Sequence, residues 1–365
     1  MMMIPSAKAS RLSHRGFTLV EIMVGMVVAL LALLVIMQVF GSFEGQKRMT
    51  TGTADAQTTG ALALQSIVRE TQLAGYGIAA FDNRVNIFKC TNAENRTVRL
   101  GGFSTAPVWV QDSVDGGPND EITVRYGTSM FGGLATQVDK NNYDSGTPAK
   151  LPVYSVVGCQ VNDTAILSNG GDDCDLLTIK SIDADAEPRP TIEFETEEPA
   201  SQFSTALIND NAYVSCIGDY RQVTFRIEGD RVMRGEEELA SGVVNMQAQY
   251  GVSDSAGDSE IKSWVDATGV WSSLNEDRRR RIKAVRVAIV VRNPLKDREV
   301  VSYACDQPDD LDDPATGVCA WKDEEGSPAP EVDLTGIDDW DRYRYRVFET
   351  IIPLRNVVWA KGGVM

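Results

Sequence analysis

The sequence predicts an α+β protein in which a long N-terminal helix carries a large, β-rich head. Two patterns lead to this prediction. The first is an almost wholly apolar run at residues 17–40, followed by an amphipathic stretch that reaches residue 74. The second is the alternation of apolar and polar residues in several later segments. Such alternation is typical of antiparallel strands with one face on a core and one face in water.

The apolar run has the length and the flanks of a membrane-spanning helix. A helix over residues 17–40 would be about 36 Å long, against about 30 Å for the hydrocarbon core of a bilayer. The preceding segment carries Lys8, Arg11 and Arg15 and no acid, so the N-terminus is expected in the cytoplasm and the body of the chain outside it. A secretory signal peptide is the alternative, but no small-residue cleavage site closes the run.

Composition and charge argue against several classes of protein. Lys and Arg total 35 and Asp and Glu total 52, which gives a formal net charge of −17. Nucleic acid repels a chain this acidic, so we expect no nucleic-acid partner and interpret the arginine-rich stretches 278–281 and 342–346 as partners of acidic loops. The single histidine, His14, lies near the N-terminus, which excludes His-dependent nucleophilic catalysis in the rest of the chain. We therefore expect no enzyme and assign no catalytic residue.

Residues 42–77 are expected to continue the helix outside the membrane, and residues 78–365 to form the head. Gly52 and Gly60 would weaken the helix by up to about 1 kcal/mol each and let it bend, and Gly75 and Gly77 would end it. In the head, apolar–polar alternation and a turn at Gly229-Asp230 predict strands. The predicted strands are 121–126, a hairpin over 221–234, 240–251, 282–292 and 345–354.

Glu21 interrupts the apolar run near its start. A carboxylate inside a membrane segment costs about 2.5 kcal/mol or more, which makes it a functional-site hypothesis. Residues 15–21, Arg-Gly-Phe-Thr-Leu-Val-Glu, resemble the type IV prepilin (class III) signal. The resemblance implies that prepilin peptidase removes a leader of residues 1–16 by cutting between Gly16 and Phe17, and methylates the new N-terminal Phe17. Glu21 would then meet the N-terminal amine of a neighbouring subunit and set the register of assembly.

The C-terminal half resembles the PilW-type minor pilins of type IV pili. The resemblance rests on the order of the hairpin 221–234 and the segments 240–251, 282–292 and 345–356, and on Leu73-Ala-Gly-Tyr-Gly77 after the helix. It implies a pilin-like fold with a transmembrane helix at 17–41, an inner-membrane location with a periplasmic head, and later incorporation into a pilus.

The implied function is priming or assembly of a type IV pilus, in a tip complex with other minor pilins. The implied partners are those minor pilins, the major pilin, prepilin peptidase and the inner-membrane assembly platform. The alternatives are a minor pseudopilin of a type II secretion system, and a membrane-anchored adhesive or calcium-binding module.

Six cysteines follow the apolar run, and an even number in an exported domain suggests disulfides. Six cysteines allow fifteen connectivities. Short loops favour Cys159–Cys174 and Cys305–Cys319, each worth about 3 kcal/mol in the chain-entropy model, which leaves Cys90–Cys216.

The sequence predicts no metal site and no cofactor. There is no Cys-x-x-Cys pair, which argues against zinc. Acidic loops lie at 115–121, 169–175, 306–313 and 333–341. Oxygen-rich loops bind Ca²⁺ in some proteins, but none of these has the spacing of an EF-hand. Solvated turns are the main interpretation, and Ca²⁺ is the minor alternative.

Overall fold

The computed structural model describes residues 16–78, 92–95, 104–113, 117–145, 149–171, 173–195, 205–307 and 314–359. The chain divides into two compact units, Met1–Thr53 and Ala54–Met365. The first unit contains the N-terminal part of helix α1 (Leu19–Gln72), and the second contains the remainder of α1 and the head. The leader lies outside the described residues except for Gly16.

Helix α1 is continuous for 54 residues. Leu, Ala, Met and Gln, all good helix formers, supply much of it. Turns follow the helix as far as Ile78, and in these turns Gly75 and Gly77 take positive φ angles of 77° and 73°. Side chains disfavour this backbone conformation, so the two glycines stop the helix, as the sequence predicts.

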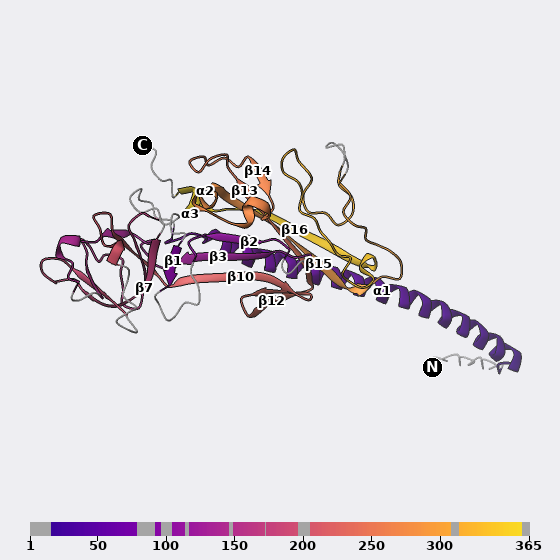
Figure 1. The fold of residues 1–365 in the computed structure, drawn as a ribbon. Coiled ribbons are helices and arrows are strands. Elements are labelled where there is room, and N and C mark those ends of the chain that lie inside the picture. Colours follow the sequence, from indigo (N-terminus) through magenta and orange to yellow (C-terminus); the bar gives the residue numbers. More distant parts are fainter. Residues whose placement is uncertain are drawn as a thin grey trace, which may run out of the picture. The chain divides into compact units, whose positions relative to one another are not determined.

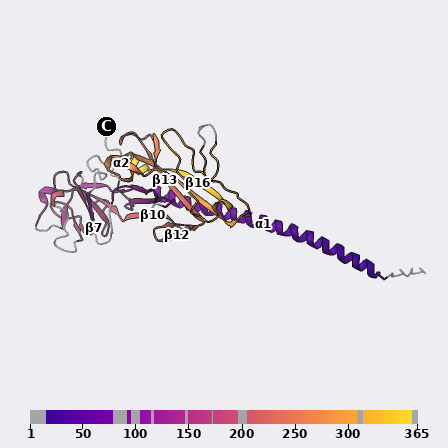
Figure 2. The same ribbon diagram turned by 45° about the vertical axis from the view of Figure 1, so that its right-hand side comes forward.

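The described strands of the head form three sheets. The first has seven strands in the order β4-β9-β6-β7-β8-β5, and β1 pairs in parallel with β7. Figures 1 and 2 show this sheet at one end of the head, away from β13 and β16. Its strands are β1 (Asn92–Asn95), β4 (Ala135–Gln137), β5 (Lys150–Pro152), β6 (Thr164–Ser168), β7 (Asp173–Asp183), β8 (Thr191–Phe194) and β9 (Tyr213–Gly218).

The other two sheets are wholly antiparallel. A five-stranded sheet has the order β12-β11-β10-β3-β2, and a four-stranded sheet has the order β14-β13-β15-β16. The five strands are β2 (Val108–Gln111), β3 (Glu121–Gly127), β10 (Tyr220–Glu228), β11 (Arg231–Arg234) and β12 (Glu237–Ser241). The four strands are β13 (Val243–Val252), β14 (Ser263–Val265), β15 (Ile282–Lys296) and β16 (Tyr343–Pro353).

Short helices lie in the connections of the head. The 3-10 turns are η3 (Lys140–Asn142), η4 (Thr205–Leu207), η5 (Gly269–Ser272) and η6 (Trp340–Arg342), and the α-helices are α2 (Glu276–Arg281) and α3 (Arg355–Trp359). Asn275 caps α2, because its side-chain oxygen accepts a hydrogen bond from the N–H of Arg278 at 3.0 Å. The predicted class, an N-terminal apolar helix followed by an antiparallel β-rich head, is therefore confirmed.

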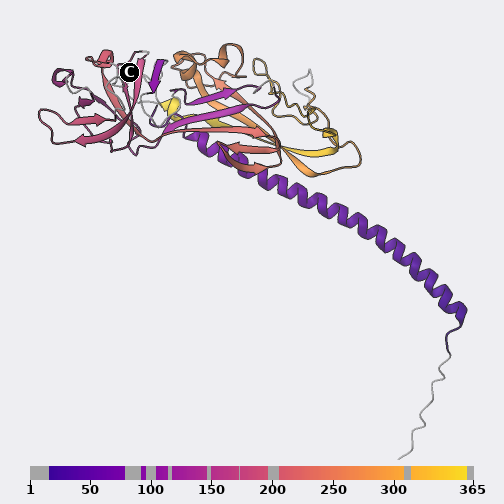
Figure 3. The ribbon, with the colours of Figure 1, turned by 60° about the horizontal axis from the view of Figure 1, so that its bottom comes forward.

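The main core lies between the C-terminal part of α1 and the two antiparallel sheets. Ala63 and Ile67 of α1 are fully buried in one cluster with Phe225 of β10 and with Val287 and Ile289 of β15. Figure 3 shows this part of α1 running alongside the strands of both sheets. The burial of these apolar side chains is the main force that holds the helix to the head.

Strands β13 and β15 are covered on both faces, although their alternation predicts one face in water. The polar face of β13 is buried because loops bond to it: the side-chain amides of Asn245 and Gln247 donate to the carbonyl of Pro118 at 2.8 and 2.7 Å. On β15 the guanidinium of Arg286 donates to Oε1 of Gln249 at 2.5 Å. The prediction of a wet face was wrong for these two strands, because alternation does not reveal which distant loop covers a polar face.

Six strands of the seven-stranded sheet, β4 to β9, are inserted between neighbouring strands of the five-stranded sheet. Strands β3 and β10 pair directly, with Gly127 opposite Tyr220, and β4 to β9 occupy the chain between them. The insertion has its own core, which includes Leu151, Leu167 and Phe194. The core of this region is thus separate from the one that holds α1.

Candidate functional site

The start of α1 brings together the three residues that the signal motif singles out. Gly16, Phe17 and Thr18 precede the helix, and Glu21 lies in its first turn. The carbonyl of Thr18 accepts hydrogen bonds from the N–H groups of Glu21 and Ile22 at 3.1 and 3.2 Å, and its Oγ1 accepts from Glu21 at 3.3 Å. Thr18 therefore acts as the N-cap, with a negative charge in the turn that favours one.

Sequence reasoning missed the role of Thr18. The pattern Thr18-x-x-Glu21 is that of a capping box, a known signal for the start of a helix. It was available in the sequence beside the prepilin motif. The local geometry thus explains why Thr18 precedes the first turn, and it leaves the side chain of Glu21 at a fixed place near the helix end.

No contact among the described residues requires a glycine at position 16. A Cβ added at Gly16 would have no atom within 4 Å, and the residue has no positive φ angle. The neighbouring Phe17 is largely exposed.

The apolar part of α1 is the stretch Leu19–Gly41. Among the described residues it is the one helical segment long and apolar enough to cross a membrane. Its most apolar part is not buried within the chain, and Leu, Val, Ile and Met side chains point outward all round the helix. A helix that is apolar on every side needs an apolar environment, which a bilayer or other helices of this kind provide.

Beyond residue 53, α1 fits closely against β16. A Cβ added at Gly60 would overlap the ring of Phe348. From its sequence context Gly60 is expected to weaken the helix, whereas in the structure it allows the close approach of helix and strand. The rest of this face carries Ala56 and Ala63, which are buried, so that small side chains line the contact.

A polar cluster fixes the C-terminal part of α1 to the five-stranded sheet. Glu70 accepts a hydrogen bond from the hydroxyl of Tyr126 at 2.8 Å and one from Nε of Arg234 at 3.1 Å, and it forms an ion pair with the same guanidinium. Burial, together with the bond to Glu70, raises the pKa of Tyr126 to about 12. The bond to Glu70 raises the pKa of Arg234. Tyr126 is therefore neutral and Arg234 charged at physiological pH.

The carbonyls that directly follow α1 are bonded by the C-terminal helix of the head. The side-chain amide of Asn356 in α3 donates to the carbonyl of Ala74 at 3.1 Å and lies 3.4 Å from that of Leu73. The N–H of Gly75 donates to the carbonyl of Arg125 at 2.8 Å. Backbone groups that have no hydrogen-bond partner within the helix are thus bonded by residues far along the chain.

The disulfides differ in part from the predicted pairing. Cys159 is bonded to Cys216, so the predicted pairs Cys159–Cys174 and Cys90–Cys216 were wrong. Cys174 is also disulfide-bonded, and Cys90 lies outside the described residues.

The sheet register gives the reason for this difference. Strand β6 pairs Ser168 with Cys174 at one end and Ala165 with Cys216 near the other. Cys159 precedes the start of β6, so it reaches Cys216 and not Cys174. Loop length alone does not include this constraint.

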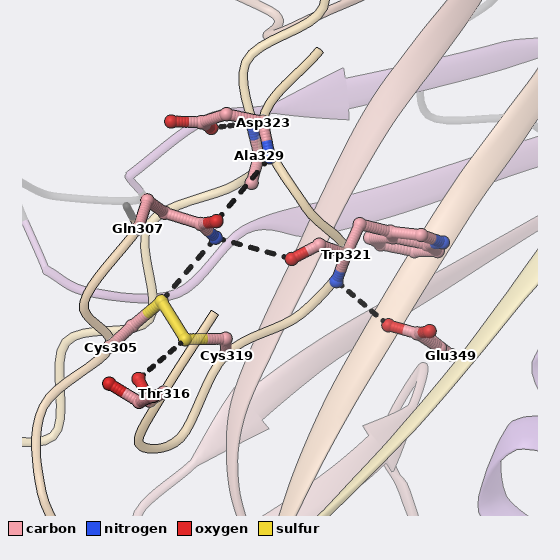
Figure 4. The surroundings of a disulfide bond; sticks show 8 residues. All are labelled: Cys305, Gln307, Thr316, Cys319, Trp321, Asp323, Ala329 and Glu349. Carbon is pink, nitrogen blue, oxygen red and sulfur yellow. Dashed lines mark hydrogen bonds between the residues drawn. A yellow bond between two sulfur atoms is a disulfide. The ribbon is translucent and has the colours of Figure 1, made fainter. Parts of the chain in front are cut away.

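The third bond, Cys305–Cys319, closes a short loop as the spacing predicts. Figure 4 shows how this loop is tied to the sheet. The N–H of Trp321 donates to Oε2 of Glu349 on β16 at 2.9 Å, and the amide of Gln307 donates to the carbonyl of Trp321 at 3.2 Å. The indole of Trp321 in turn lies 4.9 Å from the guanidinium carbon of Arg286. The disulfide loop is therefore part of the cover over the polar face of β15.

The arginine-rich stretches bond within the chain. In α2, Arg280 and Arg281 pair with Glu276 and Asp277 at 3.6 Å, and Arg279 donates to Oγ1 of Thr105 at 2.7 Å. In β16, Arg344 pairs with Asp297 at 2.9 Å. The paired acids are Glu276 and Asp277 of the same helix and Asp297, so these arginines pair with acids as predicted, but not with acids of the predicted acidic loops.

Within the described residues, the acidic loops contribute two buried carboxylates, Asp120 and Asp175. Asp120 accepts hydrogen bonds from the N–H groups of Ala248 at 2.7 Å and Ser113 at 3.1 Å. Burial raises the pKa of Asp120 to about 7, against the lowering effect of these two bonds. In the part of the chain that the structure describes, no three His, Cys, Asp or Glu side chains are grouped to hold a metal ion. Binding of Ca²⁺ stays an untested prediction.

Two family models match this chain, one near its N-terminus and one in its C-terminal half. Residues 218–356 match the family model described as type IV pilus-assembly protein W, and residues 11–37 match the prokaryotic N-terminal methylation motif. Among solved structures, the chain is similar to a type IV-like pilin from Thermus thermophilus, with 11% identity, 54% of this chain and 87% of that chain covered, and a TM-score of 0.24. No curated protein matches the chain.

The two matched regions coincide with the features described above. The methylation motif contains Gly16, Phe17 and Glu21, and the second match spans the last residue of β9 to α3. It therefore includes β16 with Phe348, the Arg234 that bonds Glu70, and the Asn356 that bonds the end of α1. Most of the inserted seven-stranded sheet lies outside both matches.

Proposed function

Since the chain is a type IV pilin of the PilW type, we propose that it acts as a minor pilin that helps to prime the assembly of a type IV pilus. One observation carries the proposal: the same chain has a methylation motif at the start of an apolar helix and a match to the assembly-protein family in its head. Its partners would be other minor pilins, in a complex at the pilus tip, and the major pilin. The inner-membrane assembly platform would receive this complex.

The proposal includes processing by prepilin peptidase. The enzyme would remove residues 1–16 and methylate the amine of Phe17. Two features support this step: Gly16 has open space around it, and Phe17 is exposed ahead of the first turn of α1. An accessible segment suits a protease site, which binds its substrate around the scissile bond.

The proposal also includes a location. The chain would lie in the inner membrane with Leu19–Gly41 as its single span, the N-terminus in the cytoplasm and the head in the periplasm, before it enters a pilus at the cell surface. The basic segment ahead of the span, with Lys8, Arg11 and Arg15, supports this orientation. The disulfides support an oxidising compartment for the head.

Glu21 would set the register of assembly. It is the one charged residue between Leu19 and Gly41, so its carboxylate is costly in lipid unless a positive group meets it. Cleavage creates such a group, the amine of Phe17. When this amine on one subunit pairs with Glu21 of a neighbour, each charge offsets part of the cost of burying the other.

The experiment that tests the proposal compares Glu21→Ala with Gln38→Ala, which removes another polar side chain from the same helix. Both variants should reach normal levels and be cleaved. Only Glu21→Ala should reduce surface pili, because only it leaves an amine unpaired in lipid. A Glu21→Ala chain with normal piliation, or one that is degraded or uncleaved, would contradict the register role.

Deletion of the chain separates the pilus from the alternative of a type II secretion pseudopilus. We expect loss of surface pili with intact secretion of folded exoproteins, and recovery of pili when the wild-type chain is restored. Loss of secretion with normal pili would instead assign the chain to the secretion system.

A further inference from the structure

A pocket lies in the connection between β15 and β16, next to the disulfide Cys305–Cys319. Its volume is about 380 Å³, within the range of about 300–1,000 Å³ that is typical of sites for small ligands. Residues from the segments 304–307 and 328–335 line it, together with Val318, Asp323 and Trp340. Neither the proposed processing nor the proposed register of assembly uses this pocket.

The buried part of the pocket lining is apolar. Val318, Val332 and Leu334 line the pocket and are buried in a cluster that also contains Val290 of β15. Trp340 packs against the same cluster and lines the pocket as well. The pocket therefore offers an apolar surface to the stem of a ligand, and an indole, which is the side chain that attracts a cation most strongly.

The charged side chains that line the pocket are all acids. They are Asp323, which is half-buried, and Glu331 and Asp333, which are exposed and so mark the mouth of the pocket. No Lys or Arg side chain lines the pocket, and none of the three carboxylates forms an ion pair with a residue that the structure describes. The electrostatic potential at the mouth therefore favours a cation.

One base reaches the wall of the pocket from β15. The guanidinium of Arg286 donates to the carbonyl of Pro328 at 2.8 Å and to Oε1 of Gln249 at 2.5 Å. The charge of Asp323 also stabilises this guanidinium, so Arg286 in turn offsets part of the charge of Asp323. The exposed carboxylates at the mouth remain for a ligand to contact.

Local hydrogen bonds hold the walls in place. Oδ1 of Asp323 accepts a hydrogen bond from the N–H of Ala329 at 2.6 Å, as Figure 4 shows. At the mouth, Oδ1 of Asp333 accepts one from the N–H of Thr335 at 2.8 Å. These bonds use one oxygen of each carboxylate and fix the direction of the other. A pocket that is formed in advance needs little ordering when a ligand binds, which lowers the cost of binding.

We propose that this pocket binds an organic cation, namely an ammonium or guanidinium group on an apolar stem. The acids select the positive charge, and the apolar lining with its indole accepts the stem. A metal ion does not fit, because no three acids of the described residues are grouped to hold one. Two sources carry the proposed chemistry, the Lys or Arg side chain of another protein and a free aliphatic amine. This proposal does not rest on the proposed role in the pilus.

The first test titrates the full chain in a non-ionic detergent by calorimetry. The probe is cadaverine, an aliphatic diamine, and the control is pentanediol, which has the same stem without a charge. We expect cadaverine to bind, with an affinity that falls as the ionic strength rises, and pentanediol not to bind at the same concentrations. Glu331→Gln should raise the dissociation constant of cadaverine about threefold. Glu325→Gln, at an exposed acid outside the pocket, should leave it unchanged.

The second test fills the pocket without changing its charge. Ala304 lines the pocket and is exposed, so Ala304→Phe should block the site while the head stays folded, which a thermal unfolding curve checks. Binding of cadaverine should be lost in this variant. A wild-type chain that binds no cadaverine, or that binds pentanediol equally well, would overturn the proposal. Full affinity for cadaverine in Glu331→Gln or in a folded Ala304→Phe chain would overturn it too.

A third set of titrations distinguishes the two sources of the cation. Acetyl-arginine methylamide and acetyl-lysine methylamide present the basic side chains on a peptide backbone. Tighter binding of either than of cadaverine would support the side chain of a protein, and tighter binding of cadaverine would support a free amine. In both cases Glu331→Gln should weaken the binding. Glutarate, a dianion with a stem of similar length, should not bind, and its binding in place of the cations would contradict the proposal.

Discussion

Gly60 of α1 and Phe348 of β16 approach so closely that any side chain at position 60 would overlap the phenyl ring. The contact joins the helix to a strand of the four-stranded sheet that lies within the match to the assembly-protein family. A glycine in a helix lowers its intrinsic stability by about 1 kcal/mol relative to alanine. The glycine is retained at this position because close packing outweighs helix propensity.

Replacement of Gly60 by alanine should therefore destabilise the head, although alanine favours the helix. Overpacking costs about 1–3 kcal/mol against a propensity gain of about 1 kcal/mol, so we expect a net loss of about 1 kcal/mol in the free energy of unfolding. Chemical denaturation of the full chain in detergent measures it. Adding Phe348→Leu to Gly60→Ala should recover part of the loss, and a stabilised Gly60→Ala variant would show that the contact is not tight.

Replacement of Glu70 by glutamine should loosen the C-terminal part of α1 from the five-stranded sheet. The change removes the partner charge of Arg234 and one acceptor from Tyr126. Since the guanidinium is about a third exposed, water compensates part of the loss, and we expect about 1–2 kcal/mol. The exposed pair Lys262–Glu260 provides the control: Glu260→Gln should change the stability by less than about 0.5 kcal/mol. Equal effects of the two variants would contradict the role of Glu70.

Asp120 should make the head lose stability as the pH rises from about 4 to about 7. Its pKa in the folded chain, about 7, lies above the ordinary value of 3.8, so the folded state binds a proton in this range that the unfolded state has released. The protonated side chain of Asp120 contributes its full stabilisation to the free energy of unfolding below about pH 4. This stabilisation is lost as the pH rises past about 7.

The slope of stability against pH measures this contribution. Asp120→Asn should flatten the slope between pH 4 and 7, while Asp210→Asn, at a carboxylate that is 83% exposed, should leave it unchanged. A wild-type slope that Asp120→Asn does not alter would show that another group titrates there.

The cysteines should form three bonds in the exported head. Peptide mapping without reduction should recover Cys159 joined to Cys216 and Cys305 joined to Cys319. Because the sequence has six cysteines, the partner expected for Cys174 is Cys90. A peptide that links Cys159 to Cys174 would contradict the strand register of β6.

The sequence is enough to predict the long helix and the order of the C-terminal strands, because both depend on local periodicity. The apolar run, the glycines after residue 74 and the alternation in β3, β10 and β16 are each visible within a few residues. The residues proposed for processing and register are visible for a different reason, since Gly16, Phe17 and Glu21 belong to a short motif with a fixed spacing.

Features that depend on distant neighbours were beyond such reasoning. The sequence gives no sign that Phe348 packs on Gly60, that the loop at Pro118 covers the polar face of β13, or that β9 carries Cys216 to Cys159. Each of these contacts joins residues separated by tens to hundreds of positions. Reasoning from local sequence therefore assigned the wrong role to Gly60. It also predicted a solvent-exposed face on β13 and β15, which is buried, and two disulfides that do not form.

The account is tested most directly by the N-terminal residue of the mature chain. Mass spectrometry of the protein purified from the membrane should find a chain that starts with N-methylated Phe17, and Gly16→Arg should leave the full precursor in the membrane. Thr18→Val, which removes the helix cap but keeps the glycine, should still be cleaved. A native chain that keeps residues 1–16, that starts beyond the apolar helix, or that still begins at Phe17 in Gly16→Arg would contradict the assignment as a processed pilin.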